Sequence, residues 1–386
     1  MLDTDVLIVG GGIAGCSTAL YAARQGMDVV LVEERDLHTG TSGANAGNLN
    51  QQLLTAKTVK SLGWEWVTAS ARMVRYYVAA NAQWRELAAE LDCPIELQTL
   101  GGISLAETEA DMAVVVRKAK LEREHGGDSI VLSKNDLRQL APYLGDDLVG
   151  GCYSPGERKV NPLLGVPAIV RLAIKEGARL FRYERVETIL PAPSGGYEVT
   201  TNHRRIRCRQ VVLAAGAGAP RLAAQFQFSL PITTSVIQTA VTEAVAPVMS
   251  HLLYHISKPL TMKQVANGNV VVGGGWPGVA DPKTGFPLVK RESIAGSMWI
   301  AQRVVPAVSN LHQLRAWAAY IFSTPDGFPI CGPVPGFPGL FMNIPNHIGF
   351  TMGPLLGRLT SELVAGRQAS LDMNPFQIGD NGLDFP

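Results

Sequence analysis

The sequence has few cysteines, and none of them stands at a spacing that binds a metal. The five are scattered along 386 residues without a Cys-x-x-Cys pair: Cys16, Cys93, Cys152, Cys208 and Cys331. This scatter excludes a zinc or iron–sulfur site of ordinary spacing built by this chain alone. It also argues against a disulfide scaffold and favours a reducing compartment.

Net charge and long apolar runs are lacking as well. The 34 Lys and Arg residues against 33 Asp and Glu leave a formal net charge of +1, so bulk charge gives no reason to expect a nucleic-acid partner. No apolar run reaches the ~18–20 residues that span a bilayer. The first apolar stretch follows Asp3 and Asp5, where a secretory signal peptide would be basic. We therefore expect a cytoplasmic protein that neither binds nucleic acid nor spans a membrane.

What the chain has in quantity is apolar side chains and glycine. Hydrophobic residues make up 46% of it and charged residues 17%, a balance typical of a globular protein. This length has room for two or three domains. The 40 glycines are about one residue in ten, against a usual ~7%. We expect many turns and close approaches of backbone segments.

The most informative pattern lies at the N-terminus. A β-branched apolar run at 6–9 is followed directly by Gly10-Gly11-Gly12-Ile13-Ala14-Gly15 and by a helix-like stretch at 17–23. A second apolar run, 29–32, ends on Glu33. This order of strand, glycine turn, helix, strand and acid is the context that gives a Gly-x-Gly-x-x-Gly motif its meaning.

Each of these residues has a physical role in binding a dinucleotide. Gly10 permits the tight turn, Gly12 lets the backbone approach a pyrophosphate, and Gly15 lets the helix pack closely on the strand. The free N–H groups and the dipole of the helix N-terminus favour the phosphates. Glu33, 18 residues after Gly15, is placed to bind a ribose hydroxyl. The alternative is a buried strand followed by a flexible glycine turn, and the helix, the second strand and the acid favour dinucleotide binding.

Later segments extend this unit without deciding between NAD and FAD. Residues 41–48 are small and polar, and they can either run along a long cofactor or form an ordinary surface loop. Residues 182–189 suggest a strand, Ser194-Gly195-Gly196 a hairpin turn, and residues 207–218 a strand that ends in small residues. This pair predicts that the chain returns to the first sheet.

With these motifs, the sequence resembles the FAD-dependent amine and amino-acid oxidoreductases of the D-amino-acid oxidase, glycine oxidase and sarcosine oxidase superfamily. The resemblance covers nearly the whole length. Five motifs occur in the family order: the glycine turn with Glu33, the segment 41–47, the strand 211–216, Thr324-Pro325-Asp326-Gly327-Phe328-Pro329, and the segment 346–354. Within the superfamily the chain is most similar to the subunits of bacterial opine oxidases, hydrogen cyanide synthase and hydroxyproline dehydrogenase. That narrower resemblance depends on residues 42–47 and on Arg315-Ala316-Trp317.

The resemblance implies an α/β fold, in which a Rossmann-like FAD-binding domain is interleaved with a sheet-rich substrate domain. The expected FAD-binding domain is discontinuous and comprises residues 1–60, 150–220 and 325–386. The expected substrate-binding cap comprises residues 61–149 and 221–324. Within the cap we expect one long amphipathic helix near residues 64–92, in which Trp84 recurs at helical spacing with other apolar residues and packs in the core. Residues 270–275 should form a strand that ends in a flexible glycine turn.

The resemblance also implies which residues bind FAD. They are Gly10, Gly12, Ile13, Ala14 and Gly15 at the pyrophosphate, Glu33 and Glu34 at the adenosine ribose, Ser42 and Asn45 near the phosphates, Ala46, Gly47 and Asn48 near the flavin ring, Val186 at the adenine, Ala214, Ala215 and Gly216 along the cleft, and Gly349, Phe350, Thr351 and Met352 at the flavin pyrimidine. A helix that starts at the last group would stabilise the negative charge that builds when the ring accepts a hydride. Gly349 and Gly353 would permit close backbone approach there. The alternative is a simple helix cap after Pro345.

Three departures from the family pattern bear on the activity. Ala319 stands where sarcosine oxidases attach the flavin through a cysteine, so we expect non-covalent FAD. Ile321 stands where glycine-oxidase-like members have an arginine, the natural partner of a substrate carboxylate. Residues 272–274 stand where sarcosine oxidases have the lysine that promotes reaction with oxygen. With no ammonium beside the flavin, we expect a dehydrogenase that passes its electrons to another carrier. The remaining candidates for a carboxylate anchor are Arg315, Lys263, Arg303, His255 and Tyr254.

The resemblance predicts oxidation of an amino acid or a secondary amine next to a carboxylate, such as an opine, proline, hydroxyproline or a D-amino acid. The neutral amine would pass its α-hydride to flavin N5, which requires orientation more than a protein acid–base pair. The side chains that could deprotonate or position the substrate are His347, Tyr254, His255 and Tyr320. The acceptor would be a quinone-type carrier or a partner protein with an iron–sulfur cluster or a second flavin. Such a partner could hold the chain at the periphery of the inner membrane.

Three alternatives remain open. The first is a sarcosine- or glycine-type oxidase that produces hydrogen peroxide. The second is an FAD-carrying electron-relay subunit with little activity alone. The third is a plain NAD-binding protein.

Overall fold

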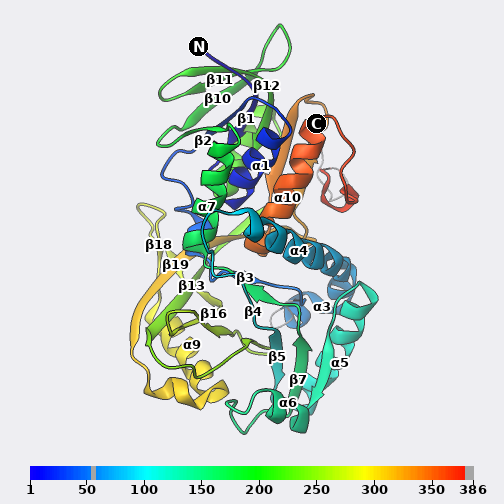
Figure 1. The fold of residues 1–386 in the computed structure, drawn as a ribbon, viewed down its shortest axis with the longest axis vertical. Coiled ribbons are helices and arrows are strands. Elements are labelled where there is room, and N and C mark those ends of the chain that lie inside the picture. The colour runs from blue at the N-terminus through cyan, green and yellow to red at the C-terminus, as the bar shows by residue number, and fades with distance from the viewer. Residues whose placement is uncertain (54–57, 379–386) are drawn as a thin grey trace.

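The computed structural model of the chain describes residues 1–53 and 58–378. It contains two eight-stranded sheets, which lie one above the other along the long axis of the molecule (Figure 1). In the part of the chain described, no helix is both long and apolar enough to cross a membrane.

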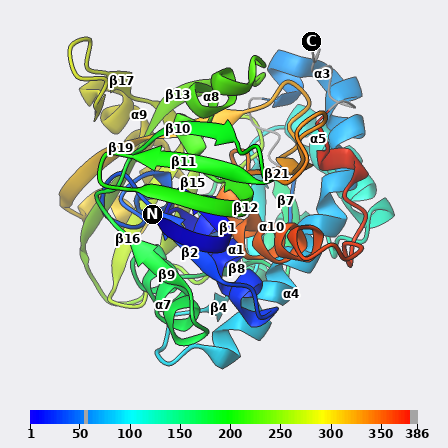
Figure 2. The same ribbon diagram turned by 90° about the horizontal axis from the view of Figure 1, so that it is seen from above.

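The first sheet contains the N-terminal strand. Its strands, in spatial order, are β10 (Val186–Pro191), β11 (Tyr197–Thr201), β12 (Arg205–Leu213), β1 (Leu2–Val9), β2 (Val29–Val32) and β9 (Arg179–Phe181), with β21 (Leu340–Ile344) beside β12 and β20 (Ile330–Pro333) beside β21. β1 is parallel to both β2 and β12, so the predicted return of the chain to the first sheet is confirmed. Figure 2, seen from above, shows the strands from β10 to β9 side by side in this order. Residues 6–9 are buried on both faces, which explains their unbroken apolar run.

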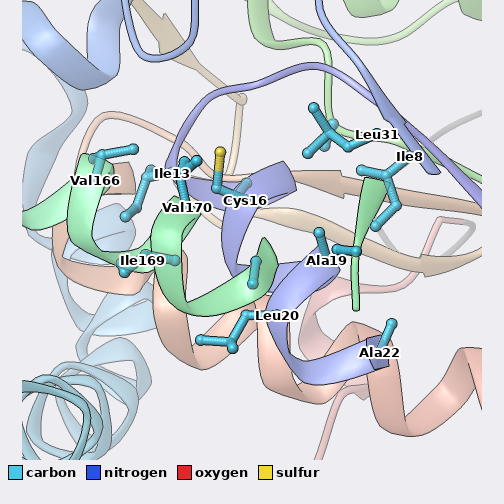
Figure 3. Close-up of a cluster of buried hydrophobic side chains, with 14 of the residues drawn as sticks. Ile8, Ile13, Cys16, Ala19, Leu20, Ala22, Leu31, Val166, Ile169 and Val170 are labelled. Carbon is cyan, nitrogen blue, oxygen red and sulfur yellow. The ribbon is translucent and has the colours of Figure 1, made fainter. Parts of the chain in front are cut away.

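Three helices cover this sheet. They are α1 (Ile13–Arg24), α7 (Pro162–Lys175) and α10 (Gly349–Val364). Side chains of α7 interdigitate with Ile13, Cys16 and Leu20 of α1, and Ile8 and Leu31 of the sheet close the same core (Figure 3). α10 lies along the other side of α1 (Figure 1). This packing holds the start of α1 against the ends of β1 and β12.

The second sheet forms the lower half of the molecule in Figure 1. Its order is β19 (Gln313–Ser323), β13 (Thr233–Ala244), β16 (Asn269–Pro277), β15 (Thr261–Gln264), β14 (Leu252–His255), β5 (Gly102–Ala106), β7 (Gly150–Ser154) and β6 (Ile130–Ser133). Its helices are α5 (Glu109–Glu124), α6 (Lys134–Leu140) and α9 (Arg291–Val304). Apolar side chains of β5, β14, β15, β16 and α9 form its core.

The remaining elements connect or border the two halves. They are α2 (Thr41–Ala44), α3 (Thr58–Ser70), α4 (Val74–Glu90), α8 (Ala219–Ala223), the small sheet of β3 (Asn48–Leu49), β8 (Arg158–Lys159) and β4 (Gln98–Thr99), and the hairpin of β17 (Val279–Ala280) and β18 (Pro287–Leu288). α4 lies between the two large sheets (Figure 1). The segment that follows β2 therefore passes through the junction of the two halves.

Some local expectations are wrong. The single helix expected at 64–92 is two helices, because a 3₁₀ turn at 71–73 separates α3 from α4, and α3 itself is kinked at Gly63. The glycines at 273–275 do not end a strand but lie inside β16. Gly274 has a φ of +119°, and a Cβ there would lie 2.4 Å from the Leu260 nitrogen, so glycine permits a close strand crossing rather than a flexible turn. The domain division stays a prediction, although β7, which begins at residue 150, belongs to the second sheet.

Candidate active site

The glycine turn after β1 is shaped so that only glycine fits at two positions. Gly10 has a φ of +115°, and a Cβ there would lie 2.4 Å from the Ala214 carbonyl oxygen. A Cβ on Gly15 would lie 1.9 Å from the Gly10 carbonyl oxygen. Gly12, by contrast, meets only the Ser42 hydroxyl at 3.1 Å, and no side chain of the described residues caps α1 from the Gly12 position. The first turn of α1 therefore has backbone N–H groups beside a glycine turn without side chains, the arrangement that binds a pyrophosphate in dinucleotide-binding folds.

Small residues at the end of β12 border this turn. The Ala214 nitrogen donates to the Val9 carbonyl at 2.9 Å, and the Gly10 nitrogen donates to the Val32 carbonyl at 2.9 Å. The carboxyl ends of β1, β2 and β12 thus meet at Gly10. Ala215 and Gly216 continue from there, and ligands of open α/β sheets bind in such a crevice.

The Glu33 carboxylate lies at the end of β2, beside the glycine turn. It accepts hydrogen bonds from the Gly11 nitrogen at 2.7 Å and the Arg35 nitrogen at 2.9 Å. A carboxylate has about four lone-pair sites, so acceptors remain for a ribose. Glu34 is exposed and faces the Arg35 guanidinium.

The chain from β9 to β10 runs alongside Glu33. The Glu184 nitrogen donates to the Glu33 carbonyl at 2.8 Å, and Val186 begins β10 two residues later. The Val186 carbonyl accepts a hydrogen bond from Arg221 at 3.1 Å. Val186 is therefore near the acid that the sequence places at the ribose, although one of its backbone acceptors already has a donor.

The segment 41–48 is an ordered turn that closes over the start of α1. The Ser42 hydroxyl accepts from the Ile13 nitrogen at 2.9 Å, which ties α2 to α1. The Asn45 side chain donates to the Ser42 carbonyl at 2.5 Å and accepts from the Gly47 nitrogen at 2.6 Å. A Cβ on Gly47 would lie 2.0 Å from a neighbouring carbonyl, and its φ is +74°. These contacts exclude an irregular surface loop.

The start of α10 lies against residues 48–50. The Thr351 hydroxyl donates to the Asn48 carbonyl at 3.2 Å and accepts from the Asn50 nitrogen at 3.1 Å. The side chains of Phe350 and Met352 are buried in the core, so this turn has mainly backbone to offer a ligand. No side chain of the described residues caps the helix at Ile348.

Two residues near α10 act differently from the sequence-based expectation. A Cβ on Gly353 would lie 2.5 Å from Ile13, so this glycine allows α10 to approach α1. Trp84, expected to be plain core, is fully buried and donates its indole N–H to the carbonyls of Phe350 and Thr351 at 3.2 and 3.1 Å. Helical spacing identified Trp84 as buried, but no sequence signal marked its partners on α10.

The sequence predicted no ammonium beside the flavin, yet Lys263 on β15 reaches the segment predicted to lie along the ring. Its buried amino group donates to the Ala46 carbonyl and, at 2.5 Å, to the Asn48 side chain. Burial and the nearby Lys159 hold the pKa of Lys263 well below its usual value. The sequence-based expectation considered only residues 272–274, which lie on β16, and β15 is the neighbouring strand.

A small cavity of about 30 Å³ lies beside the start of α10. Its walls come from separate segments: Leu53, Trp66, Val67, Ser70, Tyr77, Gly327, His347 and Ile348. The Trp66 indole N–H donates to the Pro325 carbonyl at 2.8 Å, and this bond joins α3 to the Thr-Pro-Asp-Gly turn. The described lining contains no lysine, arginine or carboxylate. The cavity is therefore apolar, with a few neutral polar groups.

His347 lies on the wall of this cavity, two residues before α10. Its surface is accessible, yet enough protein surrounds the ring that burial lowers the pKa of the imidazole to about 4. An accessible surface and a ring surrounded by protein are both expected of a side chain on a cavity wall. At neutral pH the ring is uncharged, so one of its nitrogens is an acceptor.

Tyr254 approaches the same junction from β14. Its hydroxyl donates to the Asn50 side chain at 2.7 Å. Because Asn50 is also bound to Thr351, Tyr254 is one residue away from the start of α10. The structure thus brings Tyr254 and His347 to the two ends of the segment 50–53.

His255 and Tyr320 are not brought to this place. Side chains alternate along a strand, so His255 points the other way from Tyr254, toward Glu107, and burial lowers its pKa to about 4. The Tyr320 hydroxyl donates to the Gly285 carbonyl at 2.6 Å, on the exposed loop between β17 and β18. Two of the four predicted substrate-facing side chains therefore have partners elsewhere.

Two of the predicted carboxylate anchors, Arg303 and Arg315, also lie away from the cavity. Arg303 is bound to Asp147 at 2.9 Å, and Arg315 is exposed beside the Trp317 ring. Ile321 lies half-buried on β19. Among the described residues that line the cavity, none is a lysine or an arginine.

These features together fit a flavin dinucleotide. The α1 start and Ser42 would hold the pyrophosphate, Glu33 the ribose, and residues 46–48 with the first turn of α10 would flank the ring. The two regions lie at opposite ends of the segment 41–50, which is long enough to follow an extended cofactor.

Comparison with known proteins agrees with this geometry. Residues 5–363 match the family model described as DAO, FAD dependent oxidoreductase. The chain is 27% identical to a glycine oxidase of Geobacillus kaustophilus, over 97% of this chain and 96% of that protein. It is 26% identical to one of the subunits of the opine oxidase of Rhizobium meliloti, over 97% of each.

Solved structures show the same similarity. The crystal structure of the Geobacillus kaustophilus glycine oxidase has a TM-score of 0.87, with 25% identity over 98% of each chain. That of L-proline dehydrogenase from P. horikoshii has a TM-score of 0.86, with 20% identity over 97% of each chain, which shows a shared fold. The glycine turn before α1, the acid at the end of β2 and a family match over most of the chain lead to one conclusion: this chain is a flavin-dependent enzyme of the DAO family of FAD-dependent oxidoreductases.

Proposed function

We propose that the chain oxidises an amino acid or secondary amine that carries a carboxylate next to the nitrogen. The class comprises opines, proline or hydroxyproline, and D-amino acids. The observation that carries the proposal is the apolar cavity beside His347, at the junction of the α10 start and the segment 50–53. FAD, bound without a covalent link, supplies the acceptor for a hydride at its N5 atom.

The protein's own groups would bind and orient the substrate. The N–H groups of the first turn of α10 stabilise negative charge that develops beside them. Leu53, Trp66 and Tyr77 give the cavity apolar walls, and a substrate that displaces water from it would make stronger polar contacts there. The neutral His347 ring can accept a hydrogen bond from the substrate nitrogen. Tyr254 holds Asn50 in place on the other side.

The names of relatives support the substrate class and a partner. The glycine oxidase, opine oxidase and D-amino acid dehydrogenase relatives all act, by name, on amino acids or amines. The opine oxidase and sarcosine oxidase relatives are, by name, single subunits of larger assemblies. We therefore retain a hetero-oligomer that passes electrons to a partner or a quinone-type acceptor. Its place in the cytoplasm, or at the inner membrane through that partner, belongs to the same proposal.

A second candidate is an oxidase that produces hydrogen peroxide. The observation that favours it is the Lys263 amino group on the segment 46–48, since an amino group that takes up a proton when the flavin is reduced promotes reaction with oxygen. Replacing Lys263 by methionine would separate the candidates. In an oxidase, K263M slows reoxidation by air while anaerobic reduction is retained; in a dehydrogenase, air reoxidises both forms slowly.

The first experiment is an anaerobic titration of the purified yellow protein. Octopine, nopaline, D- and L-proline, hydroxyproline, sarcosine and D-alanine are added in turn, and bleaching of the flavin bands is recorded. Bleaching by one compound identifies the substrate class, and admission of air then distinguishes oxidase from dehydrogenase. If none bleaches a protein that retains FAD, the single-chain oxidoreductase is refuted, and an electron-relay subunit that needs a partner takes its place.

A further inference from the structure

Glu157, in the turn between β7 and β8, has a carboxyl group that the activity described so far does not use. The side chain is completely buried. Its Oε1 atom accepts from the backbone nitrogens of Gln51 and Gln52 at 2.8 and 3.0 Å. Its Oε2 atom has no hydrogen-bond partner among the described residues. A buried polar atom without a partner is costly, so this oxygen calls for an explanation.

The carboxyl fits in this position only because residue 102 is a glycine. A Cβ on Gly102 would lie 1.7 Å from Oε2, so any larger residue on β5 would displace it. The buried phenol of Tyr254 is close enough to the carboxyl for each group to affect the pKa of the other. Tyr254 in turn donates to Asn50 at 2.7 Å. A continuous path of polar groups therefore leads from Glu157 to the segment that borders the start of α10.

The charges around Glu157 make it the group that changes protonation. Lys118 and Glu122 on α5 are fully buried and form an ion pair at 2.8 Å, so they cancel each other. Burial raises the pKa values of the Cys152 thiol and the Tyr254 phenol, which keeps both neutral. The backbone N–H groups of Gln51 and Gln52 and the Lys118 charge favour an ionised Glu157, but burial outweighs them and raises the pKa of this carboxyl to about 7.

We infer that Glu157, acting through Tyr254, receives the proton that an amine substrate must lose before oxidation. The inference rests on the proposed function, because amines of this class are protonated at neutral pH and only the free base can release a hydride. In the step, an N–H bond of the substrate ammonium breaks and its proton bonds to the Tyr254 oxygen. The Tyr254 proton moves at the same time to Oε2 of Glu157. One ammonium and one carboxylate become an amine and a carboxylic acid, and nothing is oxidised or reduced.

This transfer is favoured by burial. It removes two opposite charges from a low-dielectric region, where each costs several kcal/mol to hold unpaired. It also gives a role to the Oε2 atom, which has no hydrogen-bond donor among the described residues. Tyr254 needs only to rotate its hydroxyl from Asn50 to Glu157 to complete the path.

The test compares Glu157→Gln and Tyr254→Phe with the wild-type holoenzyme. Glutamine keeps the shape and the acceptor for Gln51 and Gln52, and phenylalanine removes only the hydroxyl. Glu107→Gln is the control, because Glu107 is a carboxylate of the same half that pairs with Lys258 away from this path. The readouts are FAD content and the anaerobic rate of flavin reduction by the substrate as a function of pH.

We expect the wild-type rate to fall as pH drops through about 7. E157Q and Y254F should retain FAD but reduce the rate at neutral pH by about 10²-fold or more, the usual contribution of a proton-transfer group. The deficit should shrink at high pH, where the substrate is already a free base. E107Q should keep the wild-type profile. A wild-type pH profile in E157Q with full FAD content would overturn the inference.

Infrared difference spectra give a readout that does not depend on turnover. The holoenzyme should show a protonated-carboxyl band in acidic buffer that disappears as pH rises through about 7, and E157Q should lack it. Absence of the band in the wild type also overturns the inference. If the band is present and no amine reduces the wild-type flavin at any pH, the proposed function fails while the protonation of Glu157 stands.

Discussion

Gly12→Ala separates binding of FAD from folding of the chain. Gly12 has a φ of −79° and a ψ of −178°, which alanine adopts without strain. The added methyl would meet only the Ser42 hydroxyl at 3.1 Å, a contact that a small side-chain shift relieves. We therefore expect the free energy of unfolding of the apoprotein to change by less than about 0.5 kcal/mol.

The same methyl fills the space in which a pyrophosphate would approach the backbone. Loss of one or two hydrogen bonds to a charged group costs about 1.5–3 kcal/mol each. At ~1.4 kcal/mol per tenfold change, FAD affinity should fall by at least about tenfold. The assay pairs FAD titration, followed by quenching of flavin fluorescence, with thermal unfolding of the apoprotein.

Gly26→Ala is the matched control at the other end of α1. Gly26 has a φ of +79° and no atom within 4 Å of a Cβ. Alanine there should lower stability by about 1 kcal/mol through backbone strain alone and leave FAD affinity unchanged. Wild-type affinity in G12A would show that the start of α1 does not hold the pyrophosphate, and the placement of FAD argued above would be wrong.

Three further outcomes follow from the buried contacts. Trp84→Phe removes the indole donor to the first turn of α10. The free energy of unfolding should fall by about 1 kcal/mol, and FAD should dissociate faster. An unchanged rate of FAD dissociation would show that Trp84 only packs in the core. Lys118→Met leaves Glu122 as a buried unpaired charge and should cost about 3–5 kcal/mol in denaturant unfolding, whereas Lys120→Met, at an exposed pair of the same helix, should cost under about 1 kcal/mol. Finally, the pKa of Glu157 is raised on folding from 4.5 to about 7, so the folded chain binds the extra proton and its stability falls as pH rises between these values. E157Q should therefore gain up to about 3 kcal/mol relative to the wild type from pH 4.5 to pH 7, and a constant difference in denaturant unfolding across this range would refute the raised pKa.

Much of the cofactor cradle was predictable because its signals are local. The glycine turn, the paired apolar runs and Glu33 lie within the first 33 residues, and steric limits on φ and ψ act between near neighbours. The hairpin of β10 and β11 and the return of β12 to β1 followed from the same kind of local pattern. Prediction was weaker for the long helix, since periodicity continues through the 3₁₀ turn that separates α3 from α4.

The sequence by itself determined that this chain binds a dinucleotide and, through its order of motifs, to which family it belongs. Only the tertiary structure decided which side chains meet beside the start of α10. Leu53, Tyr77, Gly327 and His347 line one cavity, although they come from four separate parts of the chain. The Tyr254 hydroxyl binds the Asn50 side chain, which is 204 positions away in the sequence. Glu157 binds the next residue, Gln51, through its backbone nitrogen. Contacts at such separation depend on how two sheets pack, and no spacing along a chain encodes that directly.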